Sequence, residues 1–161
     1  MTFFLYKKGT SLVELIAVIV IMGIIAGIAV PVTIAVINRQ KKNAAAKSAE
    51  AVVATIKQNV QELVAKASTS IEITLVYPAA KANATNTPTS VTVSVDGEAQ
   101  TGYTKEEFVV ENLKACGTIK ATYTCTGASY EFDTTTTQFG VNGYKIEVEA
   151  DGSAKVTGEM S

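Results

Sequence analysis

The sequence of 161 residues contains no histidine. This absence excludes Ser-His-Asp and Cys-His catalysis and most zinc sites, because each of these needs an imidazole. The chain also has no glycine-rich loop of the kind that cradles phosphates, and it has no internal repeat. We therefore expect no enzyme, no cofactor and no bound metal, with only a weak calcium site near Asp133 or Asp151 left open.

Basic residues are scarce in the C-terminal part of the chain. Residues 69–161 contain six lysines against twelve acidic residues, a net charge of −6, whereas residues 10–68 have a net charge of +3. Proteins that bind nucleic acids usually carry a basic patch, since neutralised phosphates supply most of the affinity. We do not expect nucleic acid to be a direct partner of this chain.

Charge is almost absent from a long apolar run that begins at Leu12. Its 23 uncharged residues, 15–37, follow Glu14 and would span about 34 Å as a helix, against a membrane hydrocarbon core of about 30 Å. A secretory signal peptide would have a shorter apolar core, of roughly 7 to 15 residues, followed by a cleavage site. The sequence therefore predicts one retained transmembrane helix.

Glu14 is the one charged residue within this apolar run. An ionisable group inside a membrane edge costs up to about 2.5 to 3.5 kcal/mol on insertion scales, unless a partner offsets the cost. The alternative is a carboxylate that lies at the level of the lipid headgroups. With a partner, the helix would serve assembly as well as anchoring.

A one-sided apolar pattern follows the membrane segment over residues 38–68. The apolar positions recur at steps of three and four residues: Ala45, Ala49, Val52, Val53, Ile56, Val60, Leu63, Val64 and Ala67. The polar positions on the other side are Lys47, Ser48, Lys57, Gln58, Gln61 and Glu62. This pattern predicts that the helix continues as an amphipathic helix whose apolar face needs a cover.

Strand patterns in residues 69–161 can provide that cover. Apolar residues alternate with polar ones over residues 71–75, 91–95 and 146–148, and Asp151-Gly152 indicates a two-residue hairpin turn between two antiparallel strands. Residues 77–89 read as a loop, and a capping box at Thr104 and Glu107 predicts a short helix that ends near Gly117. The fold class expected is α+β, with a long N-terminal helix packed on a C-terminal antiparallel sheet.

The side of the membrane on which the C-terminal part lies is not settled by counting basic residues. Lys7 and Lys8 precede the span, but Arg39, Lys41 and Lys42 follow it. Export is favoured by the single cysteine pair and by a composition rich in Ser and Thr and poor in Lys.

Cys116 and Cys125 enclose what we interpret as a short loop. A disulfide across it would stabilise the fold by roughly 2.5 to 3 kcal/mol on the chain-entropy model. The alternative is a pair of buried thiols.

The segment KKGTSLVELIAVIVIMGIIAGIAVP resembles the N-terminal signature of type IV pilins and related prepilins. The resemblance rests on Lys7-Lys8-Gly9 as a basic leader that ends in glycine, on a glutamate five positions later, and on an apolar helix with Gly23 and Pro31. It covers about residues 7–40. The resemblance implies cleavage after Gly9, N-methylation of the new terminus at Thr10 and an assembly role for Glu14. The chain departs from the family at Thr10, where phenylalanine is common.

The resemblance also implies an order of domains and a set of partners. Residues 1–9 would be a leader peptide, 10–37 the transmembrane and assembly helix, 38–68 its amphipathic half, and 69–161 an exported, β-rich globular domain. The partners would be identical subunits in a helical filament, a prepilin peptidase and the inner-membrane assembly machinery. The chain would cross the cell membrane once before assembly and form a cell-surface pilus afterwards.

Two alternatives of different kinds remain open at this stage. The chain could be a minor pilin or a pseudopilin of a type II secretion or DNA-uptake system. It could instead be a single-span anchored extracellular binding protein, although a plain anchor needs neither the Gly9 junction nor Glu14.

Electrostatic attraction favours pairing between Glu14 and the new terminus. Cleavage after Gly9 would leave an ammonium at Thr10, because the α-amino group has an ordinary pKa of about 7.7 to 8.0, and methylation would keep that charge. Unit charges about 4 Å apart attract by about 4 kcal/mol at an effective dielectric constant near 20, which is similar to the insertion cost.

Gly23, Gly27 and Pro31 mark a predicted weak point of the helix. Gly23 and Gly27 form a small-xxx-small pattern that lets helices approach closely in lipid. Pro31 lacks the amide that would bond to the carbonyl of Gly27. The alternative is an ordinary kinked membrane helix.

Overall fold

The structure is a computed structural model, and it describes residues 11–134 and 138–160. The chain divides into two compact units, Met1–Gln40 and Lys41–Ser161. One α-helix, α1 (Leu12–Val64), begins in the first unit and ends in the second. Residues 1–9, the predicted leader, and Thr10 lie outside the described residues.

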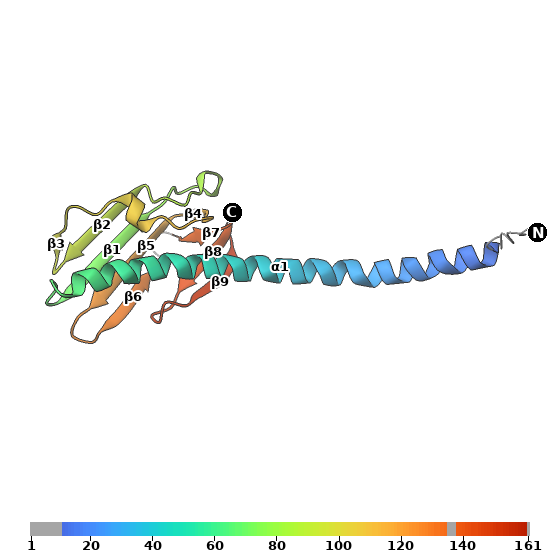
Figure 1. The fold of residues 1–161 in the computed structure, drawn as a ribbon, viewed down its shortest axis with the longest axis horizontal. Coiled ribbons are helices and arrows are strands. Elements are labelled where there is room, and N and C mark those ends of the chain that lie inside the picture. The colour runs from blue at the N-terminus through green and yellow to red at the C-terminus, as the bar shows by residue number, and fades with distance from the viewer. Residues whose placement is uncertain (1–10, 135–137, 161) are drawn as a thin grey trace, which may run out of the picture. The chain divides into compact units, whose positions relative to one another are not determined.

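The second unit has an α+β fold, as predicted (Figure 1). A five-stranded antiparallel sheet has the order β3-β2-β1-β5-β6, and a four-stranded antiparallel sheet has the order β4-β7-β8-β9. The strands of the first are β1 (Ser70–Val76), β2 (Ser90–Val95), β3 (Glu98–Ala99), β5 (Thr118–Thr124) and β6 (Ser129–Asp133). Those of the second are β4 (Ala115–Cys116), β7 (Gly140–Val141), β8 (Tyr144–Val148) and β9 (Ala154–Glu159).

Strand β1 is the centre of the larger sheet. Its residue Ile73 lies opposite Val93 of β2 on one side and Ala121 of β5 on the other. Alternate residues of β1 are buried, because a strand turns successive side chains to opposite faces. On the other face Lys120 forms a 3.0 Å ion pair with Glu72. The strands predicted at 71–75, 91–95 and 146–148 are confirmed.

The C-terminal part of α1 packs on the buried faces of the strands. Its buried apolar residues are the predicted ones: Ala45, Ala49, Val52, Val53, Ile56, Val60 and Leu63. Asn59 is also buried, which the apolar pattern did not predict, and its Nδ2 donates to the Thr55 carbonyl oxygen at 3.0 Å. The helix ends at Val64, whereas the pattern extended it to residue 68.

The helix ends early because another part of the chain binds the backbone that follows it. The carboxylate of Asp96 accepts hydrogen bonds from the amides of Ser68 (2.8 Å), Thr69 (2.6 Å) and Ser70 (2.9 Å). Asp96 itself has a φ of 53°, in the turn between β2 and β3. A side chain 26 to 28 residues away therefore directs the chain from α1 into β1.

The predicted helix from Thr104 to near Gly117 is wrong beyond its first turn. The capping box is present, and the Thr104 amide donates to the Glu107 carboxylate at 3.2 Å. The 3-10 helix η2 (Lys105–Phe108) then stops, because Val109 has an extended backbone. The chain goes on to form β4, which pairs with β7 and makes a bridge at Thr85.

The predicted disulfide is also wrong, and both cysteines are free. The segment between them is not a loop but β5, the neighbour of β1. Seven strand residues at about 3.3 Å each hold the two ends of β5 about 20 Å apart, and a disulfide needs Cα atoms closer than about 7 Å. Cys116 is buried beside the Gly140 carbonyl oxygen, with its Sγ at 3.8 Å, and Cys125 is half-buried beyond the other end of the strand.

The two remaining predictions of local structure are confirmed with changes. The predicted antiparallel pair is β8 and β9, but residues 149–153 connect the two strands, which is longer than a two-residue turn. The Gly152 amide donates to the Glu149 carbonyl oxygen at 2.8 Å within this connection. Residues 77–89 form a loop that contains the short 3-10 helix η1 (Lys81–Asn83).

Candidate functional site

The first unit presents an apolar helix surface. The large apolar side chains of residues 12–37 are exposed, from 43% at Ile37 to 73% at Leu12. Among the described residues, one helical stretch, Leu12–Lys66, is long and apolar enough to cross a membrane. Water solvates such a surface poorly, so a lipid or protein partner is expected to cover it.

Glu14 lies in the first turn of α1, with an exposed side chain. The carbonyl oxygen of Ser11 accepts hydrogen bonds from the amides of Glu14 (2.9 Å) and Leu15 (3.1 Å), so Ser11 is the residue that opens the helix. A negative charge here is favoured by the helix dipole. The spacing of Ser11 and Glu14 is also that of a capping box, in which the Glu14 side chain would stabilise the first turn of the helix.

The predicted partner of Glu14 is not within the described residues. Gly9 and Thr10 both lie outside them, so cleavage, methylation and pairing with the new ammonium stay predictions. Within residues 11–134 and 138–160, no side-chain ion pair is formed by Glu14. The carboxylate is thus available to a group from outside the described part of the chain.

Gly23 and Gly27 are not needed for packing within the described chain. A Cβ atom added to either residue would meet nothing within 4 Å. Each glycine costs a helix about 1 kcal/mol relative to alanine. A benefit that offsets this cost must come from outside, and close approach by another helix is one such benefit.

Pro31 lies inside α1, and the helix continues through it. The predicted loss of its backbone hydrogen bond leaves the carbonyl of Gly27 without that donor. Two residues on, the Thr33 hydroxyl donates to the Ala29 carbonyl oxygen at 2.8 Å. The structure shows this region as helix, so the weak point at residues 23–31 stays a prediction.

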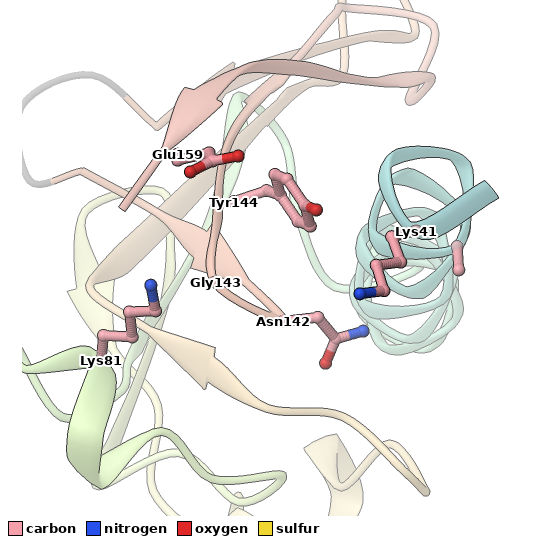
Figure 2. Close-up of a pocket in the computed structure, with 7 residues that line it drawn as sticks. Lys41, Lys81, Asn142, Gly143, Tyr144 and Glu159 are labelled. Atoms are coloured by element: carbon pink, nitrogen blue, oxygen red, sulfur yellow. The ribbon is translucent and has the colours of Figure 1, made fainter. Parts of the chain in front are cut away.

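A cleft of about 430 Å³ lies beside the turn between β7 and β8, within the second unit (Figure 2). Its lining residues are Lys41, Ala44, Lys81, Asn142, Gly143, Tyr144 and Glu159. Sequence reasoning missed this site because its residues are separated by up to 118 positions. The one local signal was the dipeptide Asn142-Gly143, which is typical of a tight hairpin turn.

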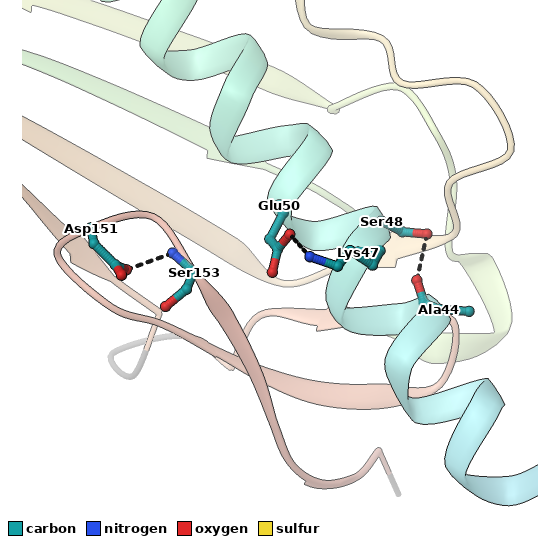
Figure 3. Close-up of polar contacts among 6 residues, drawn as sticks. All are labelled: Ala44, Lys47, Ser48, Glu50, Asp151 and Ser153. Carbon is teal, nitrogen blue, oxygen red and sulfur yellow. Dashed lines mark hydrogen bonds and ion pairs between the residues drawn. The ribbon is translucent and has the colours of Figure 1, made fainter. Parts of the chain in front are cut away.

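The calcium site left open near Asp133 or Asp151 gains no support. In the described residues, no three His, Cys, Asp or Glu side chains are grouped closely enough to hold a metal ion. The Asp151 carboxylate accepts a 2.7 Å hydrogen bond from the Ser153 amide instead (Figure 3). This bond lowers the pKa of Asp151 and shapes the β8–β9 connection.

Comparisons were made with protein families, with curated proteins and with solved structures. None of the three found a match to this chain. Function is therefore inferred from the residues of this chain alone.

Proposed function

We propose that this chain is a structural subunit of a type IV pilus. The chain is cut after Gly9 and then polymerises through its N-terminal helix into a surface filament. Its role is structural and not enzymatic. Identical subunits are its main partners, and a prepilin peptidase and the membrane assembly machinery act on it earlier.

One observation carries this proposal: an exposed apolar helix surface with a single carboxylate in its first turn. An anchor needs the apolar surface only. The carboxylate adds a cost in lipid that a neighbouring subunit's terminal ammonium would offset, and such a pair sets one axial register between helices.

The course of assembly follows from this arrangement. Before cleavage the chain crosses the cell membrane once, with its globular part exported. After cleavage the apolar surface leaves the lipid and packs against the same surface of other subunits. Gly23 and Gly27 allow close helix packing there.

Two other functions fit parts of the same observation. A minor pilin or a pseudopilin of a type II secretion or DNA-uptake system would share the helix and Glu14. A single-span anchored binding protein would share only the apolar helix, and Glu14 could serve it as a helix cap but not as a contact between subunits. The tests below separate the anchored protein from the two assembling ones.

Mass spectrometry of sheared surface filaments is the most direct test. The expected result is a dominant chain that begins at Thr10, with or without a methyl group. This result would establish processing and the status of a major subunit together. Full-length protein confined to the membrane would contradict the proposal.

Substitution of Glu14 tests the assembly role and its rival, helix capping. Glu14→Ala removes both the charge and the capping side chain, whereas Glu14→Gln removes the charge and keeps a residue that suits a capping box. We expect both variants to be processed and inserted, and neither to form filaments. Glu62→Gln is the matched control, because Glu62 is an exposed carboxylate on the same helix. Filaments from Glu14→Gln but not from Glu14→Ala would show that Glu14 acts as a cap.

A further inference from the structure

The cleft beside β7 and β8 is built on a rigid turn. Asn142 and Gly143 both have positive φ angles, 52° and 86°, as a tight hairpin turn requires. The Asn142 amide donates to the Lys114 carbonyl oxygen at 2.8 Å, and the Met160 amide donates to the Gly143 carbonyl oxygen at 2.9 Å. The turn is therefore held from both sides, by the segment before β4 and by the segment after β9.

Lys81 is placed in this cleft by the absence of a side chain at Gly143. A Cβ atom at Gly143 would lie 3.1 Å from Lys81 Cε and 3.5 Å from its Nζ. The Lys81 Nζ donates to the Met160 carbonyl oxygen at 3.1 Å. Among the described residues, one N–H of the ammonium group is used in this way, and two remain for a ligand.

Lys41 reaches the same cleft from α1, on the side opposite Lys81 (Figure 2). Neither ammonium has a carboxylate within 4.0 Å in the described part of the chain, where the ion pairs are Lys47–Glu50 and Lys120–Glu72. Glu159 also lines the cleft, but its carboxylate is more than 4.0 Å from both ammonium groups.

The neighbouring hollow adds a third positive charge. It has a volume of about 260 Å³ and is lined by Lys114 together with Lys81, Asn142 and Gly143. Three lysines thus surround one turn, although residues 69–161 carry a net charge of −6. Three lysines against the one carboxylate of Glu159 leave a local positive field that favours an anion.

We propose that this cleft binds a phosphate group. A phosphate can accept hydrogen bonds from both lysine ammoniums at once, since it offers several oxygens and more than one lone pair on each. Lysine binds phosphate as a point charge and does not need the planar geometry of arginine. The hydroxyl of Tyr144 adds a neutral donor at the same cleft, and so does the side-chain amide of Asn142, whose Nδ2 also donates to Ser48 Oγ at 3.5 Å.

Two sources can supply this phosphate, an anionic lipid headgroup or a free phosphate. The lipid is the better fit, because Lys41 follows the last residue of the apolar run, Ile37, by four residues in the sequence. Lysines directly after a membrane span attract anionic lipids. The lipid source rests on the proposed membrane-inserted subunit, whereas phosphate binding itself does not.

The test uses the full chain, labelled with nitrogen-15, in micelles of an uncharged detergent. Inorganic phosphate should shift the amide signals of Asn142 and Gly143 in a saturable way. Lys41→Gln and Lys81→Gln should each weaken binding about tenfold, as expected for loss of one charged hydrogen bond. Lys66→Gln removes an exposed lysine elsewhere on the chain and should leave binding unchanged. A well-dispersed spectrum of each variant confirms that it is folded.

Further titrations distinguish the ligand sources. Phosphatidylglycerol added to the micelles should give the same shifts, and phosphatidylcholine should not; shifts with inorganic phosphate alone would assign the site to free phosphate. Acetate that binds as tightly as phosphate would overturn the proposal in favour of a carboxylate from a second copy. An absence of saturable shifts, or equal shifts in the double variant Lys41→Gln, Lys81→Gln, would also overturn it.

The outcome for this site is separate from that for the proposed function. A chain that binds phosphate but never forms filaments would contradict the pilus subunit and leave the site intact. Filaments whose subunits begin at Thr10, formed by a chain that does not bind phosphate, would support the pilus subunit and contradict the phosphate site.

Discussion

Lys57 Nζ donates a 2.6 Å hydrogen bond to the backbone carbonyl oxygen of Asp151, and thereby joins α1 to the β8–β9 connection. The same ammonium lies 5.0 Å from the ring centroid of Tyr130 and 5.9 Å from that of Phe132. Gly152 leaves room for it, since a Cβ atom there would lie 2.5 Å from Lys57 Nζ. One side chain of the helix therefore contacts the edge strand β6 and the terminal hairpin at once.

Lys57→Met should lower the free energy of unfolding by about 1 to 2 kcal/mol, because it removes a charged hydrogen bond and a cation–π contact. Urea unfolding of the globular unit, followed by near-ultraviolet circular dichroism of the full chain in detergent, measures this change. Lys66→Met is the control and should change the free energy by no more than about 0.5 kcal/mol. Equal effects of the two variants would show that the Lys57 contacts contribute nothing.

Tyr77→Phe should stabilise the protein by about 1 kcal/mol. The Tyr77 side chain is 2% exposed, its hydroxyl has no hydrogen-bond partner in the described structure, and burial raises its pKa. A buried polar group without a partner costs about 1 to 3 kcal/mol, and phenylalanine removes the group and keeps the ring against Phe139. Thermal melts of both proteins test this, and a lower melting temperature for Tyr77→Phe would show that a buried water binds the hydroxyl.

Acid should destabilise the protein through Asp96. Hydrogen bonds from the amides of Ser68, Ser70 and Thr69 lower the pKa of Asp96 below its ordinary value of 3.8. A carboxyl group with a lowered pKa in the folded state stabilises the fold above its unfolded pKa, and this stability is lost as the pH falls below that value.

The melting temperature measured from pH 6 to pH 2.5 tests this prediction in the wild type and in Asp96→Asn. The variant should melt lower at pH 6, and the difference should shrink below about pH 4 as the wild-type carboxylate takes up a proton. A constant difference across the range would mean that the charge of Asp96 is irrelevant.

Gly117→Ala should destabilise the fold by more than about 2 kcal/mol. Gly117 has a φ of 85°, and a Cβ atom there would overlap the backbone carbonyl of Gln138. Backbone cannot move aside as a flexible side chain can, so strain and overlap add. Gly127→Ala is the matched control, because its Cβ would meet only the Ser129 hydroxyl, at 3.4 Å. Similar melting temperatures for the two variants would contradict the prediction.

Both cysteines should react as free thiols. Without reductant, the unfolded chain should give two thiols per molecule. In the folded chain Cys125 should react first, because Cys116 is buried and its burial raises the pKa of its thiol. Cys125→Ser should change the free energy of unfolding by no more than about 0.5 kcal/mol; a loss of 2 kcal/mol or more would point to a disulfide after all.

Periodicity predicted the elements whose burial is one-sided and continuous. The stripe from Ala45 to Leu63 and the alternation at Ile71, Ile73 and Leu75 are both confirmed. Strand β5 was missed although Ile119, Ala121 and Tyr123 alternate in the same way. The flanking cysteines predict a closed loop in place of a strand, and this prediction is wrong.

Long-range contacts explain the other errors. The apolar pattern predicts that Lys57 lies on the polar side of the helix. In the structure its long side chain reaches the terminal hairpin and is half-buried. The helix expected after Thr104 stops after one turn at the extended Val109, and the chain then leads to Ala115 and Cys116, which pair with β7. Neither contact can be read from neighbours in the sequence.

The sequence by itself determined the apolar span of residues 15–37, the lone carboxylate of Glu14 and the amphipathic face that continues the helix. These features depend on composition and periodicity, which are local. Only the tertiary structure decided that Cys116 and Cys125 stay apart, and that Lys41 and Lys81 line the same cleft. The physical reason is that strand pairing sets distances between residues far apart in the chain, by register and strand length, and no local pattern records them.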